Sequence, residues 1–364
     1  MKNETIRPAA LLQKLKRANP PILLDVRDIF EFQSWHIPGS INIPMIDLEQ
    51  KISSLDKDRE IITICNHGVS SKGVAEMLSG KGYHAKYLKD GLKGWNTLYE
   101  IIPVKPFVPS LLEVFQVKRL GKGCLSYIVV LSDKKRAIVI DPSKHVAQYT
   151  KYLDKNNLAL VAVIDTHIHA DHISGARILA EKTSAPYLLP KKSIALFPFH
   201  SLEDTLGDII GEETIIVETP GHTKESVCII LGKSFLFTGD TLFIESVGRS
   251  DLGQDVKANA KILFHSVIDK IFTLDEALLV LPVHNQKTML PGEPAYTAKL
   301  LNIKEKNDIH KFATDEEFAD FIHGHPSPTP PNYSKIKEIN KSGKLSNMDQ
   351  DELELGGNRC SVSL

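Results

Sequence analysis

Short apolar runs alternate with amphipathic stretches in the first hundred residues. Apolar runs of this length predict buried strands, and apolar positions three or four residues apart predict helices. The pattern predicts strands at 21–26, 61–65 and 84–88 and helices at 9–17 and 70–79. Because strands and helices alternate, we expect a small, mainly parallel sheet covered by helices, which is an α/β fold.

Strands dominate the hydrophobic pattern from about residue 113 onward. Apolar runs separated by polar turns predict two groups of strands, with amphipathic helices between and after them. The first group is expected at 115–119, 124–131, 136–140 and 158–164, the second at 214–218, 226–231, 234–237 and 277–281, and the helices at 146–153, 174–182, 315–322 and 335–340. Two strand-rich halves separated by helices predict sheets packed inside helical layers.

Proline and polar residues mark the boundaries of these regions. Pro103, Pro106 and Pro109 follow one another closely, which predicts an extended, semi-rigid linker. Beyond Ser342 the chain is polar and contains glycine, so we expect it to be loosely held and Cys360 to be an exposed thiol without a role. The chain therefore divides into a first domain at 1–102, a linker at 103–112, a second domain at 113–333 and a C-terminal tail at 334–364.

The charge balance and the cysteine spacing restrict the class of protein. The formal net charge is −1 and there is no long basic run, which gives no reason to expect nucleic acid or an anionic membrane as a partner. Four cysteines lie far apart in a chain large enough to fold without disulfides, which predicts free thiols and a cytoplasmic location. No apolar stretch reaches membrane-spanning length. The sequence leaves open whether the chains associate as a homo-oligomer.

The apolar run at 158–164 ends in a cluster of metal-binding side chains, His167, His169, Asp171 and His172. In an extended backbone, His-x-His places two imidazoles on the same side because side chains alternate with period two. Asp171 and His172 then turn away, to serve a second metal or to orient the first ligands. This spacing at the end of a buried strand predicts a metal site rather than a solvated, histidine-rich loop.

Three later turns or strand ends also carry metal-binding residues. His222 lies in Thr-Pro-Gly-His-Thr, Asp240 follows a strand in Thr-Gly-Asp, and His284 follows the last predicted strand. A single loop histidine is more often a surface residue. Together with the first cluster, however, these residues make five histidines and two aspartates, and each lies at the end of a strand or in a turn. This common placement predicts one shared site.

Cys65 ends the predicted strand at 61–65 and is followed by a glycine-containing loop and a helix. Backbone N–H groups of a tight loop and of a helix N-terminus favour negative charge, which activates a thiol and would hold an anionic persulfide. The alternative is a buried, inert cysteine. The combination of strand, cysteine, loop and helix favours the reactive thiol.

Several short motifs occur together in the first domain. They are Leu24-Asp25-Val26-Arg27, Glu31, His36-Ile37-Pro38-Gly39-Ser40, the Cys65 loop and Gly91-Leu92-Lys93-Gly94-Trp95. On these motifs, which span essentially residues 5–100, the domain resembles a rhodanese domain. The resemblance implies a rhodanese fold with Cys65 as the persulfide-carrying nucleophile. Active rhodaneses often have an arginine where this chain has Ser70, so a fixed cation near the sulfur is missing and sulfur transfer is expected to be slow or to use an unusual acceptor.

The motifs of the second domain cover its whole length. They are Thr-His-x-His-x-Asp-His at 166–172, the Gly-His-Thr turn, Thr-Gly-Asp and the late His284. On these motifs the domain resembles a metallo-β-lactamase-fold protein, which implies an αββα sandwich with metal at one edge of the sheets. The resemblance allows two metal sites, with His167, His169 and His222 in the first, Asp171, His172 and His284 in the second, and Asp240 between them.

Two branches of this family fit the motifs best. In glyoxalase II, a two-metal thioester hydrolase, both sites would be filled, with Zn(II) at two per chain. In persulfide dioxygenases, residues corresponding to His167, His222 and Asp240 hold Fe(II), one per chain, and leave positions open for substrate sulfur and O₂. The surrounding residues would then hold ligands and water through hydrogen bonds; they are His169, Asp171, His172 and His284.

Two features favour the dioxygenase. The segment Gly248-Arg249-Ser250-Asp251 is similar to the Gly-Arg-Thr-Asp of persulfide dioxygenases, and a rhodanese domain handles the same sulfane sulfur. Arg249 is a candidate for binding a substrate carboxylate, and its alternative role is an ion pair with Asp251. Both branches usually place an acidic and an aromatic residue after the late histidine, where this chain has Asn285 and Gln286.

The sequence therefore predicts a non-haem iron enzyme that oxidises glutathione persulfide, or a similar low-molecular-weight persulfide, with O₂ to sulfite. Sulfur transfer at Cys65 would be coupled to this reaction. The alternatives are a zinc-dependent hydroxyacylglutathione hydrolase and a non-enzymatic sulfur-carrier module with a degenerate rhodanese domain.

Overall fold

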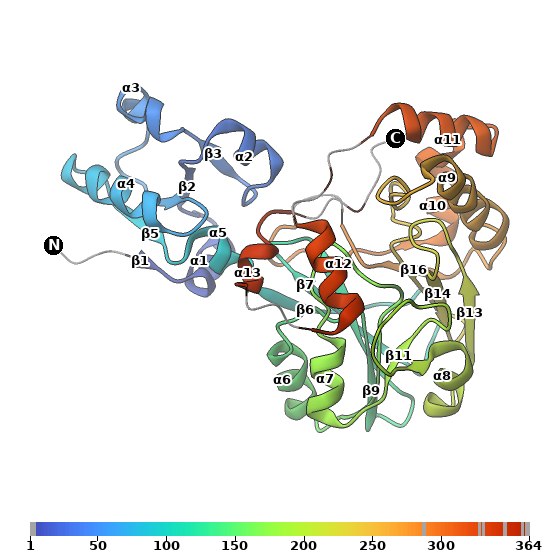
Figure 1. Cartoon of the computed structure of the whole chain (residues 1–364). Helices are drawn as coiled ribbons and strands as arrows, with labels where there is room; N and C mark the ends of the chain where they lie inside the picture. Colours follow the sequence, from blue (N-terminus) through green and yellow to red (C-terminus); the bar gives the residue numbers. More distant parts are fainter. Residues whose placement is uncertain are drawn as a thin grey trace.

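The computed structural model describes residues 5–285, 289–326, 329, 332–344, 348–357 and 360 of the 364-residue chain. Gln286 lies outside this set. The chain forms two bodies, with the smaller N-terminal one beside the larger one (Figure 1). Within the described ranges, no helix is long and apolar enough to cross a bilayer.

The first domain is a five-stranded sheet in the order β1-β5-β4-β2-β3, in which all neighbouring strands are parallel. Its strands pack on helices through apolar residues such as Leu24, Ile61 and Leu78. The structure confirms the parallel α/β arrangement expected from the sequence. Its elements are β1 Thr5–Ile6, α1 Pro8–Leu15, β2 Ile22–Asp25, α2 Ile29–Ser34, β3 Ser40–Asn42, α3 Leu48–Lys51, β4 Ile61–Ile64, α4 Val69–Gly80, β5 Ala85–Leu88 and α5 Gly91–Trp95.

The second domain contains two sheets, in the orders β12-β11-β10-β9-β8-β7-β6 and β13-β14-β15-β16-β17. The apolar runs form strands close to the expected positions, whereas β6, β11, β12 and β17 have no counterpart among the predictions because they are short or lie at sheet edges. The strands are β6 Tyr99–Val104, β7 Glu113–Arg119, β8 Cys124–Val130, β9 Arg136–Ile140, β10 Ala159–Ile164, β11 Tyr187–Leu189, β12 His200–Ser201, β13 Thr214–Glu218, β14 Val227–Leu231, β15 Phe235–Gly239, β16 Leu279–Pro282 and β17 Ala298–Lys299.

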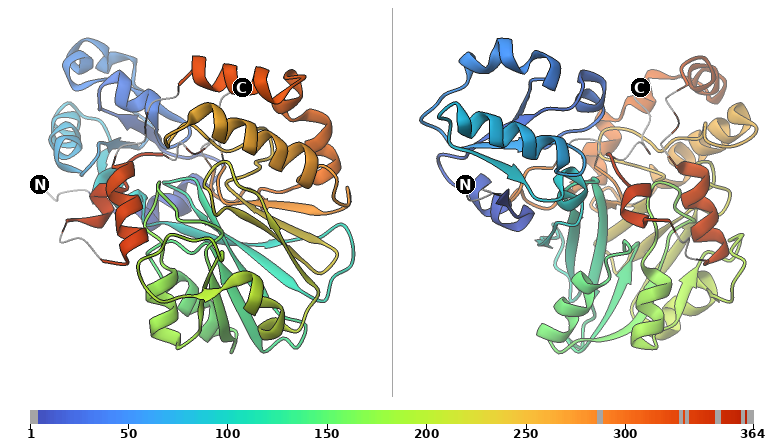
Figure 2. Two further views of the ribbon diagram at one scale, coloured as in Figure 1. Left: turned by 45° about the vertical axis from the view of Figure 1, so that its right-hand side comes forward. Right: turned by 60° about the vertical axis from the view of Figure 1, so that its left-hand side comes forward.

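Helices cover the outer face of each sheet, and the two inner faces pack together. Tyr149 and Leu179 join helices to the first sheet, Leu263 and Phe318 join helices to the second, and Tyr127 lies in the layer between the sheets. The four layers are visible edge-on in Figure 2, which confirms the expected αββα sandwich. The helices are α6 Ala147–Lys155, α7 Ala176–Thr183, α8 Leu202–Ile210, α9 Val256–His265, α10 Leu300–Lys306, α11 Asp315–Gly324, α12 Tyr333–Ser342 and α13 Gln350–Leu353.

The expected linker overlaps the second domain. Strand β6 extends from Tyr99 to Val104 and pairs antiparallel with β7, so the second domain begins before residue 103. Pro103 is tolerated in this strand because β6 lies at the edge of the sheet, where an N–H group on the outer side needs no partner. A linker without strand or helix therefore extends only from Lys105 to Leu112.

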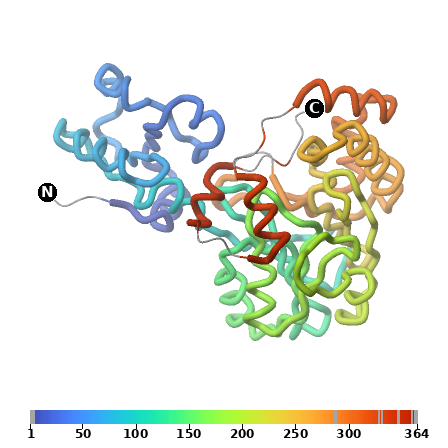
Figure 3. The backbone as a smooth tube through the Cα atoms, in the orientation of Figure 1, coloured from blue at the N-terminus to red at the C-terminus, as the bar shows by residue number. Residues whose placement is uncertain are grey.

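The expectation of a loosely held C-terminus is wrong for residues 348–357 and 360, which we call the tail. Leu353, Glu354 and Cys360 are buried. Glu354 forms ion pairs with Arg119 at 2.7 Å and Lys144 at 3.0 Å, so the tail is fixed to the second domain. Figure 3, in the orientation of Figure 1, shows the red segment that forms α12 and α13 beside the junction of the two domains. These contacts are distant in sequence, so local composition did not reveal them.

Candidate metal centre and thiol site

Three predicted ligands converge from different strands of the second domain. His167 follows β10, His222 lies in the turn between β13 and β14, and Asp240 follows β15. One donor atom of each lies within 4.8 Å of the donor atoms of the other two. Asp240 Oδ2 is 3.7 Å from His167 Nε2 and 3.5 Å from His222 Nε2. Two imidazoles and one carboxylate thus face a common point.

The other ring nitrogens and the second carboxylate oxygen are held by neighbouring groups. His167 Nδ1 contacts Thr166 Oγ1 at 3.0 Å, and His222 Nδ1 donates to the carbonyl of Arg249 at 2.7 Å. Asp240 Oδ1 is 2.7 Å from His284 Nδ1. Hydrogen bonds of this kind fix a ligand's tautomer and direct its remaining donor atom toward a metal.

Buried donor atoms without partners test whether a metal fits here. Within the described part of the chain, His167 Nε2 and Asp240 Oδ2 are buried and make no hydrogen bond. Buried polar atoms are normally paired. Two metal-ligating atoms that face each other without a hydrogen bond therefore indicate a site for a metal ion. The residues present therefore fit a metal ion.

The protonation states also suit metal binding, which requires a neutral imidazole and an ionised carboxylate. Burial, followed by the nearby His169, lowers the pKa of His167 well below its usual value. Burial by itself raises the pKa of Asp240, but His284, His222 and His167 outweigh it and hold that pKa below the ordinary range.

Gly248 allows the close packing around these ligands. A Cβ at this position would lie 1.7 Å from the carbonyl oxygen of Asp240 and 3.4 Å from His222 Nδ1. Only glycine leaves room for the 248–251 segment against the loop that carries Asp240.

The remaining predicted metal residues form two further groups. Asp171, His172 and His284 lie with Cys124 in a cluster whose donor atoms are within 4.8 Å of one another. His169 instead groups with Asp141 and Asp165, and its Nε2 lies 3.0 Å from Asp141 Oδ1. The structure therefore brings together the residues of a potential second site. The ring of His169 lies 4.2 Å from that of His167, but its ring nitrogen belongs to the group with Asp141 and Asp165 and not to the triad.

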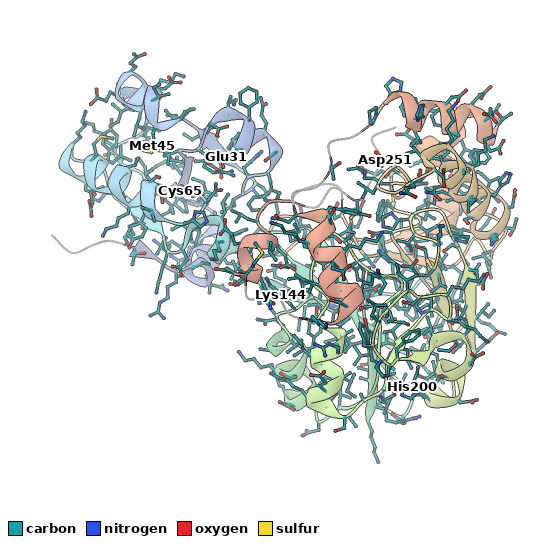
Figure 4. All side chains as sticks on the ribbon, viewed as in Figure 1. Glu31, Met45, Cys65, Lys144, His200 and Asp251 are labelled. Atoms are coloured by element: carbon teal, nitrogen blue, oxygen red, sulfur yellow. The ribbon has the colours of Figure 1, made fainter. Side chains whose placement is uncertain are left out.

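Arg249 is buried and forms a two-point ion pair with Asp251. Its Nε and Nη2 atoms lie 2.7 Å and 2.8 Å from the two carboxylate oxygens of Asp251, which Figure 4 labels in the second domain. The ion pair that the sequence offered as the alternative is thus present. Binding of a substrate carboxylate by Arg249 stays a prediction.

Cys360 is a functional candidate that sequence reasoning missed. It was expected to be exposed, yet only 3% of it is exposed, and its Sγ groups with donor atoms of Asp171, Asp240 and His284 within 4.8 Å. The backbone N–H of Arg249 donates to the carbonyl of Cys360 at 2.9 Å. Burial and the two carboxylates raise the pKa of its thiol well above the usual value. No local sequence pattern marks this residue, because its site is assembled from distant loops.

Cys65 directly follows β4, and the loop and first turn of α4 surround its sulfur with polar groups. The backbone N–H groups of Gly68 and Ser71 lie 3.2 Å and 3.4 Å from Cys65 Sγ, and the Ser71 hydroxyl lies 3.2 Å from it. Gly91 is also required here, because a Cβ on it would lie 2.2 Å from the Cys65 carbonyl oxygen. This cradle is the arrangement that the sequence predicted for an anionic sulfur.

The pocket at Cys65 has an empty volume of about 450 Å³ and includes Glu31 and Met45, which Figure 4 labels beside it. The described residues that line this pocket include one arginine, Arg27. Its guanidinium forms an ion pair with Asp25 at 2.7 Å. Ser70 also lines this pocket. The position where an arginine is often found in active rhodaneses therefore faces the thiol pocket.

Replacing Ser70 with arginine is expected to increase kcat/KM for sulfur transfer from thiosulfate to cyanide by about 10- to 100-fold. A new guanidinium would form a charge-assisted hydrogen bond with the dianionic donor, and such a bond contributes about 1.5–3 kcal/mol. The matched control is Ser79→Arg, which places the same charge at the exposed far end of α4. An equal rate in both variants would contradict the expectation.

Two family models match the chain. The rhodanese-like domain matches residues 8–98, and the metallo-beta-lactamase superfamily matches residues 120–284. The first range covers most of the smaller body, and the second lies within the larger one. Together with the αββα sandwich and the metal-binding residues at its strand ends, they define a metallo-β-lactamase-fold protein with a rhodanese-like domain before it.

Curated relatives of two kinds match this chain. A mitochondrial persulfide dioxygenase, ETHE1, from Bos taurus is 37% identical over 172 residues, which cover 45% of this chain and 65% of that protein. A hydroxyacylglutathione hydrolase from Prochlorococcus marinus is 30% identical over 201 residues, which cover 50% of this chain and 79% of that protein. The chain thus spans just under two thirds of the bovine relative.

Two solved structures share the fold. ETHE1 from Myxococcus xanthus superimposes with a TM-score of 0.55 at 26% identity, covering 63% of this chain and 97% of that one. A metallo-beta-lactamase from Staphylococcus aureus gives a TM-score of 0.58 at 24% identity, covering 64% and 73%. The chain belongs to the metallo-β-lactamase superfamily and is homologous to persulfide dioxygenases and to glyoxalase II-like proteins.

Proposed function

We propose that this chain is a persulfide dioxygenase that oxidises a low-molecular-weight persulfide such as glutathione persulfide to sulfite, with sulfur transfer at Cys65. The observation that carries the proposal is the convergence of His167, His222 and Asp240 on one point. Two histidines and one carboxylate are the ligand set of non-haem Fe(II) oxygenases. The thiol pocket in the same chain handles the same type of sulfur.

A ferrous ion held by these three side chains would supply open coordination positions and the electron transfer that joins O₂ to a persulfide sulfur. The protein supplies orientation and charge. Asp141 accepts hydrogen bonds from the backbone N–H and hydroxyl of Thr166 at 2.7 Å and 3.1 Å, and Thr166 in turn contacts His167. His284 holds Asp240, so one carboxylate oxygen remains for the metal.

Cys65 gives the chain a second step on the same sulfur. The N–H groups of Gly68 and Ser71 would stabilise a Cys65 persulfide as an anion. Sulfite can attack its outer sulfur, which forms the S–S bond of thiosulfate and releases the Cys65 thiolate. The product of one site would then be the acceptor for the other.

Oxygen uptake tests the dioxygenase directly. Iron-loaded protein is expected to consume one O₂ per glutathione persulfide and to release sulfite, since both oxygen atoms and one water oxygen enter the product. Uptake is measured with an oxygen electrode and sulfite by derivatisation. Iron-loaded protein that consumes no oxygen with this substrate would refute the proposal.

The second candidate is a zinc-dependent hydroxyacylglutathione hydrolase. It is favoured by the cluster of Asp171, His172 and His284, which offers donors for a second metal next to the triad. The Prochlorococcus relative bears this name. Two zinc ions per chain and cleavage of S-lactoylglutathione would support it over the dioxygenase.

A further inference from the structure

The pocket of Cys65 adjoins a second pocket that lies between the first domain and the tail. Arg27, Glu31 and Asn66 line both pockets, and we call these three side chains the shared wall. The second pocket has an empty volume of about 500 Å³, and residues 355–357 of the tail also line it. Small-molecule sites usually have volumes of about 300–1,000 Å³. A ligand of that size can therefore lie against the shared wall and reach the sulfur of Cys65.

Asn66 holds the two charged side chains of the shared wall in place. Its Nδ2 atom donates to Oε1 of Glu31 at 2.6 Å, and its Oδ1 atom accepts from Nη1 of Arg27 at 3.3 Å. One amide group thus bridges a carboxylate and a guanidinium. Because Asn66 directly follows Cys65 in the chain, both charges are fixed beside the reactive sulfur, where Figure 4 labels Glu31 and Cys65.

The two charges of the shared wall are not balanced to the same extent. Arg27 forms a two-point ion pair with Asp25, through Nε at 3.0 Å and Nη2 at 2.7 Å. Glu31 forms no ion pair with any residue that the structure describes, and Asp28 is a second carboxylate next to it. Ser70 brings no charge to the pocket of Cys65. The shared wall therefore favours a ligand that brings a positive charge to Glu31.

Arg27 can bind a carboxylate of the same ligand. Its guanidinium has five N–H groups, and the described partners of these groups are Asp25, the Trp35 carbonyl and Asn66. One N–H of Nη1 has no partner among the described residues. An α-amino acid group carries an ammonium and a carboxylate on one carbon, so its two charges match those of Glu31 and Arg27.

We propose that Cys65 passes its sulfur to a thiol that carries a free α-amino acid group, an inference that rests on the proposed sulfur transfer at Cys65 and adds the class of acceptor. Glu31 binds the ammonium of this acceptor, and Nη1 of Arg27 binds its carboxylate. Cysteine and the γ-glutamyl end of glutathione both carry such a group. Sulfite lacks it and attacks the same sulfur without using the shared wall.

The acceptor reacts as a thiolate. It attacks the outer sulfur of the Cys65 persulfide, so that a new S–S bond forms on the acceptor and the S–S bond at Cys65 breaks. Cys65 leaves as a thiolate beside the N–H groups of Gly68 and Ser71 and takes up the proton that the acceptor loses. No oxidant is needed, because the transferred sulfur keeps its oxidation state. The product is a low-molecular-weight persulfide, which is the class of substrate proposed for the metal centre.

Transfer from Cys65 loaded with sulfur tests the acceptor class. Full-length protein without iron or oxygen is treated with inorganic polysulfide, freed of excess reagent and mixed with L-cysteine, glutathione or N-acetylcysteine, which lacks the ammonium. The Cys65 persulfide is followed by alkylation and mass spectrometry. In Glu31→Gln, the rate with cysteine or glutathione, divided by the rate with N-acetylcysteine, is expected to fall about 10- to 100-fold, because a charge-assisted hydrogen bond is lost. A fall for only one of the two thiols identifies which of them the site accepts.

The matched control is Glu76→Gln. Glu76 is exposed on α4 and lines neither of the two pockets, so this variant is expected to keep the wild-type ratio. A second measurement needs no variant. L-Serine or S-methylglutathione, which have the amino acid group but no thiol, is expected to inhibit transfer in the wild type competitively, whereas N-acetylserine is not.

Two results would overturn the acceptor class while sulfur transfer at Cys65 stands. They are an unchanged ratio in Glu31→Gln and the absence of inhibition by both amino acid analogues. A Cys65 persulfide that reacts with none of the three thiols would overturn thiol transfer as a whole. None of these measurements uses iron or oxygen, so the dioxygenase is tested separately by oxygen uptake.

Discussion

Replacing His222 with alanine is expected to abolish iron binding. This residue supplies one of only three donors in the triad, and its other ring nitrogen is already fixed by the Arg249 carbonyl. Loss of a group that merely orients a ligand costs about 10–100-fold in metal affinity, so loss of a ligand itself is expected to cost more than a hundredfold. The measurement is iron per chain in protein purified without oxygen, together with oxygen uptake on glutathione persulfide.

The matched control is His200→Ala. His200, which Figure 4 labels, is exposed on β12 in the second domain, and it belongs to none of the metal groups among the described residues. It is expected to keep one iron per chain and full oxygen uptake. Retention of iron by His222→Ala at the level of His200→Ala would contradict the assignment of the triad.

A second variant distinguishes a centre with one metal ion from a centre with two. His172 lies in the neighbouring cluster with Asp171 and His284 and is not a member of the triad. If the chain holds a single iron, His172→Gln is expected to leave the metal content at one per chain. A fall from two metals to one would instead support the two-zinc hydrolase.

Local sequence patterns were sufficient to predict the thiol site. The apolar run at 61–65 forms β4, and the helix after it brings the N–H groups of Gly68 and Ser71 to the sulfur. All of these residues lie within a few positions of Cys65, so the geometry follows from strand, loop and helix alone. The metal residues were found for a related reason, since each lies at a strand end or turn and the two sheets bring those ends together.

The tail could not be predicted in this way. Its ends are polar and contain glycine, which locally is typical of a loosely held segment. What fixes it are contacts across more than a hundred residues of sequence, such as those of Glu354 with Arg119 and Lys144. The prediction at Pro103 differs from the structure for another reason. Proline was taken to exclude a strand, but β6 is an edge strand, and an edge strand accepts proline.

Replacing Glu354 with glutamine is expected to lower the free energy of unfolding by about 3–5 kcal/mol, the usual cost of removing one partner from a buried ion pair. Glu354 is fully buried, and its carboxylate faces Arg119 and Lys144 as well as the backbone N–H of Ile173. Glutamine keeps the size and one acceptor, so the change removes mainly the charge. The free energy is measured by urea titration followed by circular dichroism.

The pH dependence gives this prediction a second readout. Burial by itself raises the pKa of Glu354, but Arg119 and Lys144 outweigh it and lower the pKa from 4.5 to about 2. A depressed pKa in the folded state means that the charge contributes its full stability above about pH 4.5 and loses it as the pH falls toward 2. The stability difference between the wild type and Glu354→Gln should therefore be constant from pH 7 to about 5 and should shrink below 4.5.

The control for Glu354→Gln is Glu352→Gln on α13, the short helix that ends just before Glu354. The Glu352 side chain is about half exposed, and an exposed ion pair contributes about 0–1 kcal/mol, so this variant should unfold nearly as the wild type does. Equal stability of the two variants would mean that the Glu354 contacts do not hold the tail. Because the N–H that Glu354 accepts belongs to Ile173, directly after His172, loss of its charge should also loosen the histidine loop. The same variant is therefore expected to bind iron more weakly than Glu352→Gln, which would tie the fixed tail to the integrity of the metal centre.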